Sequence, residues 1–239
     1  MRILSIDTTS IAGSVALSEN DKLIAQEQQG AGGTHSEKLF PTIDHLLQVA
    51  KWQQSDIQGI AVAIGPGSFT GLRIGLAAAK GFALALDCPV AGVSSLATLA
   101  LNGLGFSGTV IPLIDARRSE IYAAAWQVDS EGNMKQKLEE LVAPPDQIVK
   151  LLSEIKGDFL LVGDGALAYS DYLCKGLKHR AHIAEGAQVM PQAVNLALLS
   201  WKRLVKGRGD DVASLVPNYI RRSDAEIGFM GKRKIPPPL

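Results

Sequence analysis

The order of apolar and polar positions along the chain predicts strands in two similar groups. Short apolar runs bounded by turn residues predict strands in the first half, at 2–8, 14–19, 22–28, 57–65 and 89–93. The same pattern recurs in the second half, at 109–116, 120–128, 134–142 and 158–164. In both halves the first strand ends in Ile-Asp, at Asp7 and at Asp115.

Helical spacing of apolar residues fills the gaps between these strands. A single apolar stripe predicts a helix from about His35 to Lys51, with Pro41 expected either to kink it or to mark its true start. The stripe consists of Leu39, Ile43, Leu46 and Ala50. Further helices are expected over about 71–86, 94–101, 144–155, 166–177 and 192–205.

Three strands, a helix, a strand and a helix therefore occur twice in succession. This repetition predicts an α/β fold with two similar lobes, each a mixed sheet with helices packed against it. We expect lobes over 1–104 and 105–224, with the last helix, 192–206, able to pack back on the N-terminal lobe, and a flexible tail over 225–239. A single mixed α/β domain with the same order of elements is the alternative.

The segment GPGSFTGLRIGL, from residue 65, resembles a phosphate loop but matches none of the familiar templates. It has no lysine after its glycines before Lys80, its glycines are spaced one residue too far apart for a dinucleotide fingerprint, and Ser68 lacks the flanking glycines of a nucleophile elbow. Instead, Gly71, Gly75 and Ala79 recur every fourth residue, a spacing that lets another backbone approach closely. The helix could pack in this way inside its own domain or on another subunit.

Composition and charge limit the classes of function. Apolar residues make up 46% of 239 residues, and 24 basic residues balance 24 acidic ones, so no overall charge attracts nucleic acid. Cys88 and Cys174 have neither disulfide-framework nor metal-site spacing, which fits a reducing cytosol. Residues 88–114 are uncharged, but glycine and proline interrupt them, so we expect buried elements there and a cytoplasmic protein without a membrane segment.

Several polar residues could hold an anion or a nucleotide. Asp7 and Thr8 precede a hairpin and could bind phosphate, Asp115 ends the matching strand, and Gly163 and Gly165 could let a purine approach the backbone. Each of these stretches also suits an ordinary turn. No histidine pair has the i, i+4 spacing of a helical metal site, so no metal is expected, and no serine or cysteine has a recognisable activating context.

Taken together, several motifs resemble the bacterial TsaB (YeaZ) family. They are IDTTS followed by SVAL, HSEKLFPTIDHLL, GPGSFTGLRIGL, IDARRSEIYAA and PNYIRR, and the resemblance covers about residues 2–222. It implies the duplicated actin-like fold of sugar kinases. It also implies a part in making threonylcarbamoyladenosine beside the tRNA anticodon, together with the paralogous subunit TsaD. The His-x-x-x-His metal pair of that subunit is not present in this sequence.

The resemblance implies a non-catalytic subunit that binds and activates a TsaD-like transferase through its N-lobe helices, and that forms a homodimer when alone. ATP and metal would belong to the TsaD-like partner and to a TsaE-like ATPase, and tRNA would be contacted indirectly. The expected partner-contact residues are His35, Leu39, Ile43, Leu46, Phe69, Leu72, Gly75, Leu76 and Ala79. The alternatives are an ATP-dependent phosphotransferase of the sugar-kinase type, using Asp7 and Asp115, and a protease.

Overall fold

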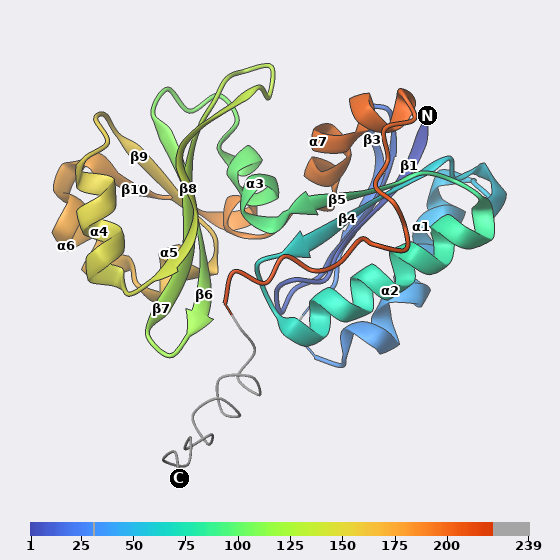
Figure 1. The fold of residues 1–239 in the computed structure, drawn as a ribbon, viewed down its shortest axis with the longest axis horizontal. Coiled ribbons are helices and arrows are strands. Elements are labelled where there is room, and N and C mark those ends of the chain that lie inside the picture. Colours follow the sequence, from blue (N-terminus) through green and yellow to red (C-terminus); the bar gives the residue numbers. More distant parts are fainter. Residues whose placement is uncertain (31, 222–239) are drawn as a thin grey trace, which may run out of the picture.

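Two lobes lie side by side in the computed structural model, which describes residues 1–30 and 32–221 (Figure 1). The expected tail, 225–239, lies outside the described residues. The N-terminal sheet has the order β3-β2-β1-β4-β5, and its strands are β1 (Arg2–Asp7), β2 (Ser14–Glu19), β3 (Lys22–Gln28), β4 (Gly59–Gly65) and β5 (Val90–Ser94). The C-terminal sheet has the order β8-β7-β6-β9-β10, and its strands are β6 (Thr109–Arg117), β7 (Glu120–Val128), β8 (Met134–Ala143), β9 (Phe159–Val162) and β10 (Ala181–Ile183).

The two sheets share one topology. In each, the first three strands pair antiparallel, and the fourth strand lies parallel between the first and the fifth. The duplication expected from the sequence is therefore confirmed, and β10 adds a fifth strand to the four expected in the second half. The order of neighbours also explains why Asp7 and Asp115 occupy matching places, because β1 and β6 are the central strands of their sheets.

Helices cover both faces of both sheets. They are α1 (His35–Ala50), α2 (Phe69–Leu86), α3 (Ser95–Ala100), α4 (Pro145–Ser153), α5 (Asp164–Ala168), α6 (Ser170–Leu177) and α7 (Ala193–Val205), with short 3₁₀ turns at Gln54–Asp56, Leu101–Gly103, Lys178–Arg180 and Gly186–Val189. The N-terminal sheet packs on α1 and α2 with one face and on α7 with the other. The C-terminal sheet packs on α3 with one face and on α4, α5 and α6 with the other.

Helices α3 and α7 are exchanged between the lobes. Each follows the fifth strand of its own half, yet Leu96 and Leu99 of α3 join the core of the C-terminal sheet, and Leu196 and Leu204 of α7 join that of the N-terminal sheet. The two helices meet where Asn195 Nδ2 donates to the Thr98 carbonyl oxygen at 3.0 Å. We therefore call β1–β5 with α1, α2 and α7 the N lobe, and β6–β10 with α3–α6 the C lobe.

Local signals account for most element ends, and two details differ from the expectation. Thr34 and Glu37 form a capping box at the start of α1, so the helix begins at His35 and continues through Pro41. The helix expected over 166–177 is divided, because Tyr169 has φ −118 and ψ 20, which lies outside the helical region.

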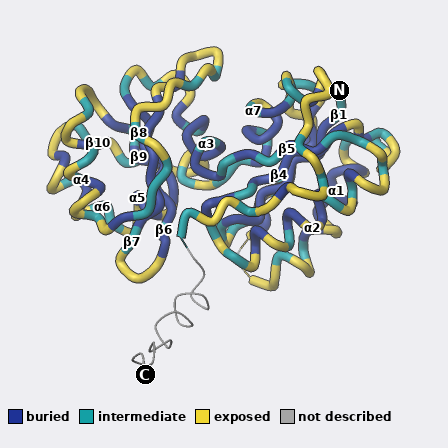
Figure 2. Tube along the Cα trace, viewed as in Figure 1, coloured by how far each residue is buried: buried dark blue, intermediate teal, exposed yellow. Residues whose placement is uncertain are grey.

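Dark segments at the centre of each lobe in Figure 2 mark the two cores.

After α7 the chain returns along the N lobe and crosses to the C lobe, a path not foreseen in the sequence. Asp210 makes an isolated antiparallel bridge with Val90, which covers the free edge of β5. Leu215 then enters the N-lobe core at 8% exposure, and Ile220 packs against the C-lobe core. This red segment crosses the front of the gap between the lobes in Figure 1.

Candidate functional site

Asp7, the expected phosphate-site carboxylate, is sealed inside the N lobe. Its Oδ1 accepts hydrogen bonds from the Thr9 backbone N at 2.9 Å and from Thr9 Oγ1 at 2.6 Å, and the residue is 1% exposed. Its buried Oδ2 has no hydrogen-bond partner among the described residues. Burial raises the pKa of Asp7, and the bonds from Thr9 and the charge of His35 offset only part of that effect. The carboxyl group therefore faces the interior.

Two glycines of the segment GPGSFTGLRIG, residues 65–75, make room for the turn that follows Asp7. A Cβ on Gly71 would lie 1.8 Å from the Thr8 carbonyl oxygen, and one on Gly75 would lie 2.3 Å from Thr8 Oγ1. Thr8 Oγ1 in turn donates to the Gly71 carbonyl oxygen at 2.7 Å. Ser68 caps the helix by accepting from the Gly71 backbone N at 3.3 Å. Of the two alternatives left open by the four-residue spacing, packing inside the domain is the one observed for Gly71 and Gly75.

Asp115 occupies the matching place in the C lobe, where it is partly buried and has a charged partner. Its Oδ1 accepts from the Arg117 backbone N at 2.8 Å, and its Oδ2 lies 3.2 Å from Arg117 Nη1. Asp164 Oδ1 accepts from the Asp115 backbone N at 3.1 Å, and burial raises the pKa of Asp164. The carboxylate of Asp115 is thus paired with the exposed side chain of Arg117.

The glycines of VGDGA serve the packing of their own turn. Gly163 has φ +105, and a Cβ there would lie 2.2 Å from the Leu113 carbonyl oxygen. A Cβ on Gly165 would lie 2.9 Å from the Leu113 carbonyl carbon. Both glycines let the turn approach strand β6 closely, which is sufficient reason for their presence without a bound purine.

Two cavities lie between the lobes, with one stretch of the β1–β2 turn bordering both. Thr9, Ser10 and Ile11 line each cavity, and the volumes are about 300 and 360 Å³. Asp115 borders the smaller cavity and Gly163 the larger, whereas Asp7, Thr8 and Gly165 border neither. The five expected anion-site residues are therefore not brought together around one space.

Most of the expected partner-contact side chains are buried in the N lobe itself. The residues with 6% exposure or less are Leu39, Ile43, Leu46, Leu72, Leu76 and Ala79, and Gly75 is buried as well. These residues face their own sheet and the β1–β2 turn, because one apolar stripe on each helix is needed to close the core. This corrects the expectation that these side chains face a partner.

The other two expected contact residues also have intramolecular partners. His35 Nε2 donates to the Ser10 carbonyl oxygen at 2.8 Å, so it fixes the turn after β1. Phe69 stacks on Tyr219 with ring centroids 4.8 Å apart. Elsewhere on α1, His45 Nδ1 lies 2.7 Å from Glu27 Oε2.

An apolar groove of about 510 Å³ lies on the outer side of α1 and α2. Phe40, which is 52% exposed, and Phe82 form its walls, with ring centroids 6.1 Å apart. We call this feature the α1–α2 groove, and its lining is Ser36, Phe40, Gln54, Ile74, Ala77, Ala78, Gly81, Phe82, Ala85 and Leu86. The sequence signal for it was an apolar residue, Phe40, that lies outside the buried stripe of its helix.

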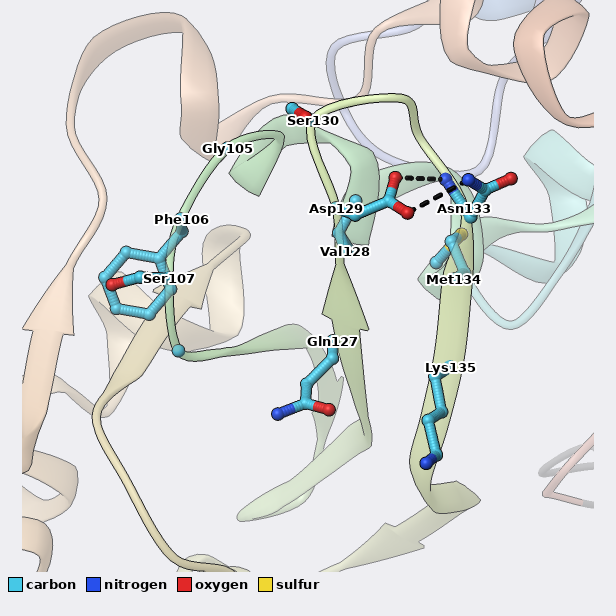
Figure 3. A pocket seen from close by; sticks show the side chains of 11 residues that line it. Gly105, Phe106, Ser107, Gln127, Val128, Asp129, Ser130, Asn133, Met134 and Lys135 are labelled. Atoms are coloured by element: carbon cyan, nitrogen blue, oxygen red, sulfur yellow. Dashed lines mark hydrogen bonds between the residues drawn. The ribbon is translucent and has the colours of Figure 1, made fainter.

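A broader cavity of about 560 Å³ lies in the C lobe, beside the hairpin between β7 and β8 (Figure 3). Asp129 Oδ1 accepts from the backbone N of Glu131 and of Asn133, each at 2.9 Å, and its Oδ2 accepts from Asn133 Nδ2 at 2.9 Å. The Asn133 side chain and backbone lower the pKa of Asp129. These polar groups close the β7–β8 hairpin, so they are occupied in holding the turn.

Two further features of the described residues concern metals and membranes. Within residues 1–30 and 32–221, no three His, Cys, Asp or Glu side chains are grouped so that they could hold a metal ion. In the same part of the chain, α2 alone has the length and apolar composition of a membrane-spanning helix. Seven of its 18 residues are buried in the N lobe.

Comparison with known proteins decides the family. A family model described as "TsaD: tRNA N6-adenosine threonylcarbamoyltransferase" matches residues 21–229. The tRNA threonylcarbamoyladenosine biosynthesis protein TsaB of Bacillus subtilis is 34% identical, over 98% of this chain and 100% of its own length. The TsaB of Escherichia coli is 32% identical, over 97% of this chain and 100% of its own length. The chain belongs to the TsaB family.

Solved structures agree with this assignment. The structure titled "YeaZ from Pseudomonas aeruginosa" has a TM-score of 0.75 at 29% identity, covering 91% of this chain and 100% of that one. An activator of 2-hydroxyisocaproyl-CoA dehydratase from Clostridium difficile has a TM-score of 0.53 at 12% identity, covering 87% of this chain and 97% of that one, and shows the fold alone. This TsaB-family chain therefore has the duplicated actin-like fold expected from its sequence.

Proposed function

We propose that this chain works in tRNA threonylcarbamoyladenosine biosynthesis as a non-catalytic subunit that binds and activates a TsaD-like transferase. The similarity to TsaB proteins along nearly the whole chain supports the pathway. The α1–α2 groove supports the binding role, because it is an apolar surface on the two helices that the family resemblance points to. The groove is the single observation that carries the proposal.

Activation would come from binding rather than from chemistry on this chain. A subunit that contacts the competent arrangement of its partner more favourably than other arrangements shifts the partner toward competence. ATP and metal would be held by the TsaD-like subunit and a TsaE-like ATPase in the cytoplasm, and tRNA would be reached through the assembled complex. In the absence of the partner, the same groove would pair two copies of this chain.

Gly81→Glu tests the groove as the binding surface. Gly81 is exposed in the groove, and a Cβ there meets no atom within 4 Å, so the fold should tolerate the change. A carboxylate buried against an apolar partner should cost about 2 kcal/mol or more, which is roughly a thirty-fold rise in Kd. We expect loss of co-purification with the TsaD-like subunit and of threonylcarbamoylation by the reconstituted complex.

Two control variants separate charge at the groove from other effects. Gly81→Ala keeps the groove apolar and should retain binding. Gln147→Glu adds the same charge at an exposed position of α4, the C-lobe counterpart of α1, and should also retain binding. Normal affinity of Gly81→Glu for the partner would show that the partner binds elsewhere.

The phosphotransferase alternative rests on the two cavities between the lobes. Calorimetric titration of the isolated chain with Mg-ATP distinguishes it, because a kinase of this fold must bind the nucleotide itself. We expect no binding in the micromolar range, since Asp7 borders neither cavity and Asp115 is paired with Arg117. Micromolar binding would favour the alternative.

A further inference from the structure

Helices α4 and α6 place their carboxyl-terminal ends at one edge of the C lobe. Helix α4 leads into β9 and α6 leads into β10, and these two strands are parallel, with Phe159 paired to Ala181. The starts of both strands, and therefore the ends of both helices, lie at the same edge of the sheet. The helices also pack closely, because a Cβ on Gly176 would lie 2.6 Å from Val149 Cγ1. Figure 1 shows both helices on the side of the C lobe that faces away from the N lobe.

Charge is sorted along these two helices. The first turns carry Asp146 in α4 and Asp171 in α6, whereas the last turns carry Lys150 and Lys175. A cation in a last turn is favoured by the helix dipole, which accounts for these two lysines without a ligand. The same reason does not apply to the cations of the connections that follow the helices.

The connections after α4 and α6 add exposed lysines at the same edge. Arg180 donates to the carbonyl oxygens of Ile155 and Gly157, to the latter at 2.8 Å, and so ties the two connections together. Lys156 stands between those two carbonyl groups in the chain, and Lys178 is two residues before Arg180. Both lysines are exposed, so the contact brings two solvated cations to one surface.

We call this surface the distal basic face. Its members are the exposed side chains of Lys150, Lys156, Lys175, Lys178 and His179. The connection between α4 and β9 contributes two carboxylates, Glu154 and Asp158. Within residues 1–30 and 32–221, no ion pair involves any of the four lysines. In a chain with 24 basic and 24 acidic residues, this local excess of positive charge favours a polyanionic partner.

An aromatic ring and a cavity adjoin the distal basic face. His182 of β10 lies edge-on to Phe106, with ring centroids 6.2 Å apart. Phe106 and Lys135 both line the cavity of about 560 Å³ shown in Figure 3. Cations interleaved with aromatic rings are typical of surfaces that bind RNA, because phosphates contact the cations and unpaired bases stack on the rings. The combination favours RNA over an acidic protein.

We propose that the distal basic face binds backbone phosphates of the tRNA that is modified. The choice of tRNA rests on the proposed function, because a chain that works in threonylcarbamoyladenosine biosynthesis meets this RNA. The α1–α2 groove lies on the other lobe, so a protein bound there leaves the distal basic face accessible (Figure 1). The contact is then direct and adds to those that the TsaD-like subunit makes.

Titration of fluorescently labelled tRNA with the isolated chain, residues 1–239, tests the face without the partner. We expect wild-type binding to weaken as salt rises, because binding releases counterions from the phosphates. Lys156→Gln combined with Lys178→Gln should raise Kd about tenfold in about 0.1 M salt. Because two phosphate contacts are lost, the slope of log Kd against log salt should fall by about 1.4–1.8.

Lys202→Gln combined with Lys206→Gln is the matched control. It removes two exposed lysines from the end of α7, in the N lobe, and changes the net charge equally. Its Kd and slope should stay close to those of the wild type. Equal losses in the two double variants would show that net charge alone governs binding and would overturn the proposal. Wild-type binding by the Lys156 and Lys178 variant, shown to be folded by circular dichroism, would overturn it as well.

Co-purification with the TsaD-like subunit separates this proposal from the function proposed above. The Lys156 and Lys178 variant should keep that interaction, because the α1–α2 groove is unchanged. Failure of the wild-type chain to bind the subunit would contradict the proposed function, while the tRNA titration of the isolated chain would still decide this proposal. Loss of the subunit by the variant, with tRNA binding intact, would identify an acidic protein as the occupant and overturn the assignment to RNA.

Discussion

Asp7 ends strand β1 with a buried carboxyl group that borders neither of the two interlobe cavities. An aspartate at this point of the chain predicts a phosphate or nucleotide site, and the sequence offers no sign that the group is buried. Whether Asp7 is buried or open to a ligand depends on Gly71 and Gly75, because their lack of a side chain allows Thr8 to lie against α2. The burial of Asp7 is thus set by residues more than sixty positions later in the chain.

Asp7→Asn should stabilise the protein at neutral pH. Because the folded-state pKa of Asp7 is raised above its unfolded value, the folded chain binds more protons, and stability falls as pH rises between these two values. Asparagine keeps an acceptor for Thr9 without the charge. We expect the urea midpoint of Asp7→Asn to be higher than that of the wild type at pH 7, with the difference disappearing below about pH 4.

Asp44→Asn, at an exposed position of α1, is the control because it changes the net charge equally. It should alter the urea midpoint little at any pH. Lower stability of Asp7→Asn than of the wild type at pH 7 would show that the ionised carboxylate is favoured by the fold.

Hydrophobic periodicity was sufficient to predict where strands and helices lie, but not what the apolar face of a helix contacts. The strands and helices were largely predictable, because alternation and helical spacing are local properties. The role of the stripe Leu39, Ile43 and Leu46 was not, because an apolar face that closes a core and one that binds a partner have the same spacing. The groove residue Phe40 could have been noticed, since it falls outside that stripe.

Glycines on helix α2 should respond in opposite ways to substitution by alanine. Gly71→Ala places a methyl group on the Thr8 backbone and should destabilise the fold by about 1–3 kcal/mol or more. Gly81→Ala meets open space and should stabilise it by about 0.5–1 kcal/mol. Chemical denaturation of the two variants measures both changes. Equal effects would mean that the two glycines do not face different surroundings.

At the scale of the whole molecule, the sequence boundary near residue 104 does not separate the two packing units. Helix α3 belongs to the first half of the sequence but completes the core of the C lobe. Helix α7 belongs to the second half but completes the core of the N lobe. Hydrophobic spacing shows that such a helix has an apolar face, but not which sheet that face will meet. The same limit applies to residues 210–221, which carry no periodic pattern and whose contacts lie on both lobes.

Leu196→Ala in α7 and Leu96→Ala in α3 test the exchange. Both leucines are fully buried, so each change should cost about 2–5 kcal/mol. Hydrogen exchange followed by mass spectrometry should show faster exchange in β1 and β4 for Leu196→Ala, and in β6 and β7 for Leu96→Ala. If faster hydrogen exchange were confined to the half of the sequence that carries the mutation, it would contradict the assignment of α3 to the C lobe and of α7 to the N lobe.

The position of α7 has a consequence for synthesis on the ribosome. The N-terminal sheet is translated first, yet one of its faces is covered only when residues 193–205 emerge. During most of translation that face, which includes Ile3, Ala61 and Val93, is without its native cover. The nascent chain is therefore expected to depend on slow elongation or on a chaperone until its last helix arrives, and truncation before α7 should yield aggregates instead of a folded half.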